Sequence, residues 1–120
     1  MSNIVILTGR LGRDAEVRTT QGGQKVANLN IATTEAWKDR NSGEWKEKTQ
    51  WHRVVTWQEG LADMLANKAK SGRLVQVTGT LEYRSWRKDG EDTDRQQAEI
   101  IIGPKGSIQF LDKAPEDGAA

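Results

Sequence analysis

The stretch from Trp37 to Trp57 reads W-K-D-R-N-S-G-E-W-K-E-K-T-Q-W-H-R-V-V-T-W, and the prediction of the fold starts from it. It holds four of the five tryptophans, and the fifth, Trp86, lies in a second segment of similar character. Lys, Arg, Glu and Thr separate these rings, where a core tryptophan usually has aliphatic neighbours. Flat apolar faces held among positive charges are typical of surfaces on which the bases of a single nucleic-acid strand stack.

Strands are predicted on both sides of the polar loop at residues 38–44. Residues 25–34 alternate between apolar and polar side chains, which is the two-residue period of a half-buried strand. Residues 46–57 are rich in β-branched and aromatic residues. We therefore expect a long hairpin that carries Trp37, Trp45 and Trp51.

The remaining pattern predicts further strands and one helix. Leu61, Met64 and Leu65 recur at helical spacing within residues 59–71, and Gly72 supplies a stop. Gly9 suggests a bulge or a tight bend in the first strand. The other expected strands cover residues 3–11, 15–19, 74–83, 95–102 and 107–111, with a polar loop at 84–94.

This order predicts an all-β fold, a five-stranded Greek-key barrel of the oligonucleotide-binding type. Its one α-helix would fall between the third and fourth strands, and long β-hairpin loops would lie before and after it. We expect a single domain over residues 1–111 and a short flexible end over residues 112–120. That end carries three acidic residues and one basic residue, so residues 1–111 have a net charge of +3 although the whole chain has +1.

Several protein classes are excluded or disfavoured by composition. The chain has no cysteine, so disulfides and thiolate metal sites are excluded. No run approaches the roughly 18 apolar residues of a membrane helix, and the N-terminus does not resemble a signal or transit peptide. We therefore expect no membrane association and a cytoplasmic protein.

The sequence contains no recognisable catalytic constellation. His52 is the only histidine, and none of the common hydrolase, metalloprotease or phosphate-loop patterns occurs. Residues 103–107 resemble a phosphate loop only superficially, since no helix is expected to follow. The acidic residues within 89–94 lack the ordered spacing of a calcium loop and fit a solvated hairpin tip. We expect a protein that is not an enzyme and that needs neither a cofactor nor a metal.

The binding interpretation depends on how rings and cations are spaced. Trp51 and Trp57 bracket Arg53 on one side of the predicted strand, and Arg84 and Trp86 share one strand face. Stacking of a base on an aromatic ring contributes roughly 1–3 kcal/mol and tolerates any base. The alternative is that some of these tryptophans cap the barrel core.

Five motifs occur in order along residues 3–111, almost without gaps. They are I-V-I-L-T-G-R-L-G-R-D-A-E-V-R, V-A-N-L-N-I-A-T, E-W-K-E-K-T-Q-W-H-R-V-V, L-V-Q-V-T-G-T-L-E-Y-R-S-W and I-Q-F-L. In their residues and their order these motifs resemble a known family, the bacterial single-stranded DNA-binding proteins.

The resemblance implies a barrel that assembles as a homotetramer and wraps single-stranded DNA without sequence preference. The stacking residues that it implies are Trp37, Trp51, Trp57 and Trp86. The phosphate-contacting residues that it implies are Arg40, Arg53, Lys70 and Arg84. It places His52 and the first strand, with Ile4 and Ile6, at a subunit interface. Trp45 falls where the family varies and receives no role.

The resemblance also implies a cellular role, which is to coat and protect single-stranded DNA during replication, recombination and repair. Such a protein is expected in the cytoplasm, associated with the nucleoid. Family members usually end in an acidic tip that recruits other proteins, but residues 115–120 read P-E-D-G-A-A. We therefore expect either a DNA-binding core or a short natural form, without recruitment through that tip.

Two other functions are compatible with the sequence. The nearer alternative is a dimeric barrel of the same fold that binds single-stranded DNA during primosome assembly. The further one is a carbohydrate-binding barrel, because sugars also stack on tryptophan. A sugar platform would gain nothing from the many neighbouring Lys and Arg residues.

Overall fold

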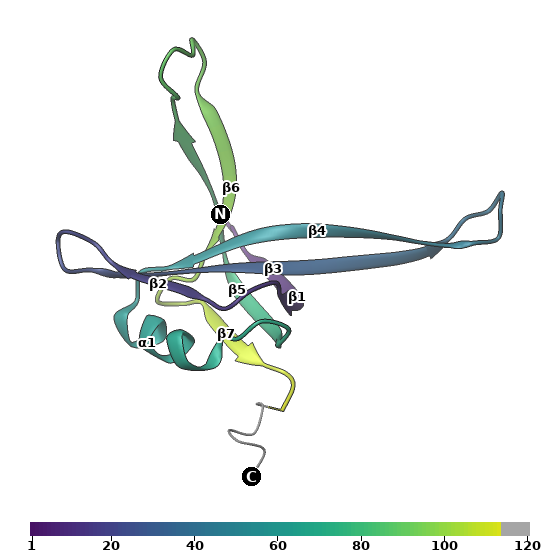
Figure 1. The fold of residues 1–120 in the computed structure, drawn as a ribbon, viewed down its shortest axis with the longest axis horizontal. Coiled ribbons are helices and arrows are strands. Elements are labelled where there is room, and N and C mark those ends of the chain that lie inside the picture. Colours follow the sequence, from purple (N-terminus) through teal and green to yellow (C-terminus); the bar gives the residue numbers. More distant parts are fainter. Residues whose placement is uncertain (114–120) are drawn as a thin grey trace.

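The structure is a computed structural model, and it describes residues 1–113 (Figure 1). Most of the end expected to be flexible, residues 112–120, therefore lies outside the described residues. The elements are β1 (Val5–Leu11), β2 (Glu16–Thr19), β3 (Lys25–Lys38), β4 (Trp45–Thr56), α1 (Glu59–Lys68), β5 (Leu74–Trp86), β6 (Arg95–Ile101) and β7 (Ser107–Phe110).

Five of the strands close into a barrel. β1 pairs with β3 through Arg10 and Leu11 and with β5 through residues 5–10, so the order β1-β3-β4-β6-β5 returns to β1. The β4–β6 pair is parallel and the other pairs of this ring are antiparallel. β2 adds to β3, and β7 adds to β5. Since α1 falls between the third and fourth strands of the ring, the predicted fold class is confirmed.

The core lies inside this ring and is closed by α1. Alternate residues of each strand point inward, as the two-residue period requires. In α1, Ala62 and Leu65 are buried, and the helix packs against β2 and β3. The fully or nearly fully buried apolar cluster is Leu11, Ala27, Leu29, Ile31, Val54, Ala62, Leu65, Ala69, Val75, Val77, Ile100 and Ile102.

Two hairpins extend beyond the barrel as arms (Figure 1). We call them the β3–β4 arm and the β5–β6 arm. β3 continues to Lys38, and the prediction that it ends at Thr34 is wrong. β5 likewise continues to Trp86, within the segment predicted as a loop. Cross-strand pairing maintains both extensions, and a pattern of charged residues along one strand does not reveal that pairing.

Of the two features predicted at Gly9, a bulge or a tight bend, the bulge is wrong. The pairing of β1 with β5 is continuous across it. A β-carbon on Gly9 would collide with the backbone carbonyl of Ala32, where β1 crosses close to β3. The close approach of two backbones therefore accounts for this glycine.

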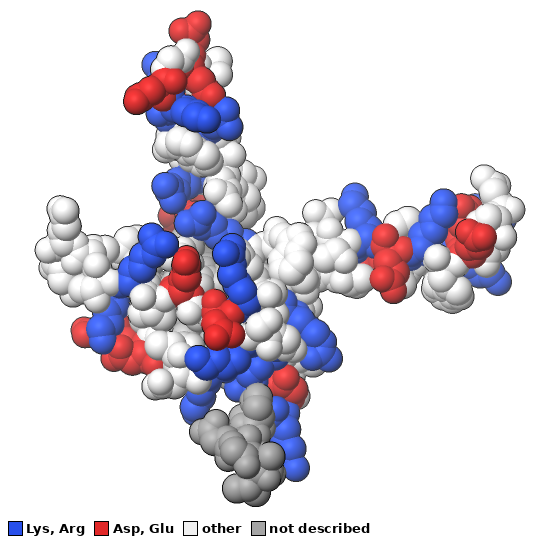
Figure 2. Space-filling view, viewed as in Figure 1, with Lys and Arg blue, Asp and Glu red and all other residues white. Residues whose placement is uncertain are grey.

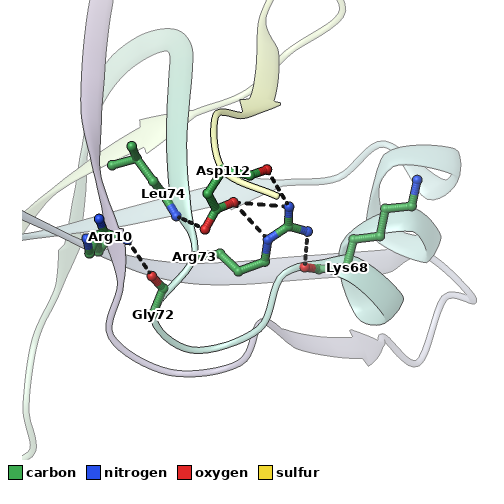
Figure 3. Close-up of polar contacts among 6 residues, drawn as sticks. All are labelled: Arg10, Lys68, Gly72, Arg73, Leu74 and Asp112. Atoms are coloured by element: carbon green, nitrogen blue, oxygen red, sulfur yellow. Dashed lines mark hydrogen bonds and ion pairs between the residues drawn. The ribbon is translucent and has the colours of Figure 1, made fainter. Parts of the chain in front are cut away.

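A buried arginine joins α1 to the end of the barrel (Figure 3). The guanidinium of Arg73 donates from Nη1 to the Lys68 carbonyl at 3.2 Å and from Nε to Oδ1 of Asp112 at 3.1 Å. It also lies 4.2 Å from the centroid of the Phe110 ring. The Leu74 N–H donates to the Asp112 carboxylate at 3.0 Å, and together with Arg73 this bond lowers the Asp112 pKa. Asp112, two residues after β7, is thereby fixed to the start of β5.

Candidate nucleic-acid interface

All five tryptophans lie at the surface of the chain. Their exposed fractions are 44% for Trp37, 71% for Trp45, 63% for Trp51, 52% for Trp57 and 39% for Trp86. Leu, Ile, Val and Ala residues fill the barrel core instead. The alternative in which some of these rings cap the core is therefore wrong for this chain.

A continuous groove runs along the outer side of the barrel between Trp51 and Trp57. It consists of three adjoining cavities of ≈ 340, 270 and 360 Å³. The first cavity is lined by Trp51 and shares Arg13 and Asn30 with the second. The second shares Arg18, Asn28 and Arg53 with the third, which reaches Trp57. We call this surface the Trp51–Trp57 groove.

The strand period explains why Trp51 and Arg53 line the same groove. Side chains two apart on a strand point to the same face, and Trp51 and Arg53 are two apart on β4. Trp57 follows directly after the end of β4 and lines the same end of the groove as Arg53. The predicted bracketing of Arg53 by the two rings is confirmed as a structural arrangement.

Four arginines line the groove, and two of them were missed by the sequence analysis. Arg53 and Arg84 were among the expected residues, whereas Arg13 and Arg18 come from the loop before β2 and from β2 itself. With its amide oxygen turned toward Arg13, Asn30 accepts from Nε and Nη2 at 2.5 Å. The pairing of short β2 with β3 carries Arg18 into the groove, and no pattern in the sequence indicates that pairing.

One buried acid modifies this basic surface. Glu99 is 8% exposed, and its Oε2 lies 2.9 Å from Nε of Arg53. Nη2 of Arg53 also lies 3.5 Å from Oδ1 of Asn28. The ion pair with Glu99 neutralises part of the charge of the Arg53 guanidinium.

Trp86 and Arg84 lie together on the β5–β6 arm. The guanidinium carbon of Arg84 is 5.6 Å from the centroid of the Trp86 ring, within the range of a cation–π contact. Arg84 also lines the Trp57 end of the groove. The expectation that these two residues share a strand face is confirmed, and Arg84 connects the groove to this arm.

The other expected DNA-binding residues are more widely spread. Trp37 lies on the β3–β4 arm opposite Lys46, on the face away from Trp51. Arg40 is exposed in the turn at the tip of that arm. Lys70 follows α1, and its Nζ is 3.9 Å from Oδ2 of Asp14. Asp14 lies in the loop that begins at Gly12 and also lines the second cavity of the groove.

The expected interface residues occupy two separate places. Ile4 and Ile6 are 69% and 61% exposed, and Ile6 pairs with Thr78 of β5. His52 is half-buried, pairs with Ile31 of β3, and its Nε2 lies 2.8 Å from Oγ1 of Thr33. Within residues 1–113, neither strand pairing nor a hydrogen bond joins His52 to β1.

A closed five-stranded barrel with an outer groove of arginines and exposed tryptophans defines a protein of the oligonucleotide-binding fold class. The single-strand binding protein family model matches residues 2–111. The chain therefore belongs to the single-strand binding protein family, which is a family of binding proteins and not of enzymes.

Two similar proteins extend this comparison. A protein named single-stranded DNA-binding protein from Rhizobium meliloti (strain 1021) is 43% identical over 120 residues, covering 98% of this chain and 68% of the relative. A solved structure described as the Plasmodium falciparum SSB complex with ssDNA superposes with a TM-score of 0.82 and 37% identity. It covers 93% of this chain and 96% of the other.

Two further observations concern only residues 1–113. α1, the helix found there, is too short and too polar to cross a membrane. Within the same residues, no three His, Cys, Asp or Glu side chains gather in a way that could hold a metal ion.

Proposed function

We propose that this protein binds single-stranded DNA without sequence preference. The observation that carries the proposal is the Trp51–Trp57 groove, in which four arginines lie between two exposed indole rings. The similarity to a structure described as a complex with ssDNA supports the same function. A groove of this kind offers cations to the phosphates and aromatic faces to the bases, which are chemically common to every sequence.

Binding begins with electrostatic capture in this proposal. Arg13, Arg18, Arg53 and Arg84 attract the phosphate backbone and release its counterions, so the affinity falls as salt concentration rises. Arg40 on the β3–β4 arm and Lys70 beside the Gly12 loop extend the positive track beyond the groove. Figure 2 shows Lys and Arg side chains distributed over the barrel and both arms on the face that it displays.

Stacking then fixes the bases. Trp51 and Trp57 receive bases at the two ends of the groove, while Trp86 and Trp37 receive them on the two arms. Each stacked base contributes roughly 1–3 kcal/mol. Because stacking needs an unpaired base, it favours a single strand over a duplex.

The cellular role that follows is to coat exposed single strands and keep them unpaired during replication, recombination and repair. A bacterial protein with this role acts in the cytoplasm, where it associates with the nucleoid. Arginine cations and indole faces recognise features that every nucleotide has, which suits a protein that must cover any sequence.

Assembly as a homotetramer is the second part of the proposal. Ile4, directly before β1, and Ile6 on β1 expose apolar surface next to a cavity of ≈ 700 Å³ that Ile4 helps to line. Apolar residues exposed side by side on one strand are suited to packing against a second copy, and His52 provides a further polar contact surface. A dimer that serves primosome assembly is the competing arrangement, and the mass in solution distinguishes the two.

The proposal is tested by equilibrium binding of a labelled oligothymidylate at several salt concentrations, with a duplex and a neutral oligosaccharide as competitors. We expect salt-sensitive binding that the duplex and the sugar compete for poorly. Salt-insensitive binding that the sugar displaces would instead support the carbohydrate-binding alternative. Multi-angle light scattering on the same sample gives the assembly state.

A further inference from the structure

Trp45 is the most exposed of the five tryptophans, at 71%, and neither the groove nor the family resemblance gives it a role. It is the first residue of β4 and lies directly opposite Lys38, the last residue of β3. Both therefore lie near the tip of the β3–β4 arm, which projects away from the barrel (Figure 1). A ring in this position is open to any ligand that follows the arm.

The β3–β4 register places Trp45 on the same face of the arm as Trp51. Directly opposed residues of an antiparallel pair share a face, and the face repeats every two residues. The hydroxyls of Thr34 and Thr49 lie 3.0 Å apart on this face. The opposed pairs, in order from the barrel to the tip, are Ala32–Trp51, Thr34–Thr49, Ala36–Glu47 and Lys38–Trp45.

The surface between the two rings is low and mostly uncharged. Ala32, Thr34 and Ala36 form the β3 side of it, and all three have short side chains. Trp45 and Trp51 are six residues apart along β4, which corresponds to about 20 Å of strand. A single strand of DNA leaving the Trp51–Trp57 groove can therefore follow this face, which turns gradually with the twist of the hairpin.

A lysine lies beside Trp45 on the same face of the arm. Lys38 is opposite the ring and makes no ion pair with any residue from 1 to 113. Lys46, on the other face of the arm, has its Nζ 2.9 Å from Oδ2 of Asp39. The Trp45 face thus combines an exposed ring with a cation, Lys38, and carries one acidic residue, Glu47, between the two rings.

We propose that Trp45 is an additional base-stacking site, which extends the DNA track from Trp51 along one face of the β3–β4 arm. This proposal rests on single-stranded DNA binding as the function of the groove. It adds a dependence of affinity on DNA length that the groove alone does not provide. The contribution of Trp45 depends on DNA length, because only a strand long enough to pass Trp51 reaches the tip.

The test is a titration with oligothymidylates of graded length, from about 4 to about 16 nucleotides. We expect the wild-type protein and Trp45→Ala to bind the shortest oligonucleotides equally. The longest should bind Trp45→Ala roughly 5- to 140-fold more weakly, the range expected for one lost stacked base. Trp45→Phe should retain most of the affinity and Trp45→Leu should not. The control is Gln50→Ala, an exposed residue of the opposite arm face, which should match the wild type.

The other possible results separate failure of the Trp45 proposal from failure of DNA binding by the groove. If Trp45→Ala equals the wild type at every length while Trp51→Ala binds weakly, the Trp45 proposal is overturned and DNA binding by the groove stands. Equal losses at all lengths, or equal binding by the Phe and Leu variants, would also overturn it, since neither fits stacking at the tip. Failure of the wild type to bind any oligothymidylate would remove the function of the groove itself.

Discussion

The Trp51 ring packs directly over Gly12, so closely that a β-carbon on Gly12 would overlap Cζ3 and Cη2 of the ring. Gly12 is held in turn by its N–H, which donates to the Asn30 carbonyl at 3.0 Å. Its φ is not in the left-handed region, so backbone conformation does not require a glycine here. The space that Trp51 occupies does require one.

Gly12→Ala should therefore weaken DNA binding without unfolding the protein. Because the Trp51 ring is 63% exposed, it has room to turn away from the added methyl group, so the thermal midpoint should change little. The affinity for an oligothymidylate should fall by up to the loss in Trp51→Ala, about 1–3 kcal/mol. In the double variant the two losses should not add, because both remove the same ring position. Additive losses would show that Gly12 acts independently of Trp51.

Arg84→Ala and Arg53→Ala should differ in their effect on salt dependence. Removing one phosphate contact to a single strand lowers the slope of log K against log salt by about 0.7. We expect about this change for Arg84→Ala and a smaller one for Arg53→Ala, because Oε2 of Glu99 already lies 2.9 Å from the Arg53 guanidinium.

The pairing with Glu99 provides an internal control for that difference. In a Glu99→Gln background the carboxylate charge is gone, so Arg53→Ala should then lower the slope by the full amount. An unchanged, small effect in this background would mean that Arg53 does not contact phosphate. The measurement is a set of binding isotherms over a range of salt concentrations.

The contact between Asp112 and Leu74 predicts a pH-dependent stability. The pKa of Asp112 is lowered, chiefly because its carboxylate accepts from the Leu74 N–H and secondarily because Arg73 is adjacent. Its stabilisation is thus complete above the pKa of an unfolded aspartate, about 3.9, and is lost as the pH falls toward the lower folded value. Asp112→Asn should melt earlier at neutral pH, and the gap to the wild type should narrow below about pH 4.

Thermal denaturation at a series of pH values checks this prediction. Asp92→Asn is a suitable control, because Asp92 is exposed on the β5–β6 arm and should show no such convergence. Parallel melting curves for Asp112→Asn and the wild type across the whole range would contradict the role assigned to Asp112.

Ile6→Asp should reduce the assembly state of the protein. Ile6 is 61% exposed on β1, so the change buries no charge within one chain and the barrel should still fold. It would, however, place a charge in the proposed subunit interface, where desolvation is costly. Light scattering should then give a smaller mass than for the wild type. The same measurement on Thr8→Asp, a residue of the same exposed face, shows how far the interface extends along β1. An unchanged oligomer would place the interface elsewhere.

The fold could be predicted from the sequence wherever one face of a strand is buried. The alternation in β3 and β5 identified their barrel portions, because Leu29 and Val77 must point inward while their neighbours do not. The arms could not be delimited in this way. They have no buried face, so their extent depends on pairs such as Lys38–Trp45, which become visible only when both strands are placed.

Only part of the candidate site could be predicted from the sequence. The rings and Arg53 follow from the two-residue period of β4. Arg13 and Arg18 did not, because the short strand β2 gives no clear pattern and its place beside β3 decides where Arg18 lies. Gly12 was likewise unpredictable, since its importance comes from a ring that is distant in sequence.

The most direct test of the central claim is a stoichiometric titration of the folded protein with poly(dT), followed by its intrinsic tryptophan fluorescence. If bases stack on the exposed rings, the fluorescence should fall strongly at low salt, and added salt should restore it as DNA is released. Trp51→Ala should show both weaker binding and less quenching. A folded wild-type protein whose fluorescence does not change at low salt would contradict the account.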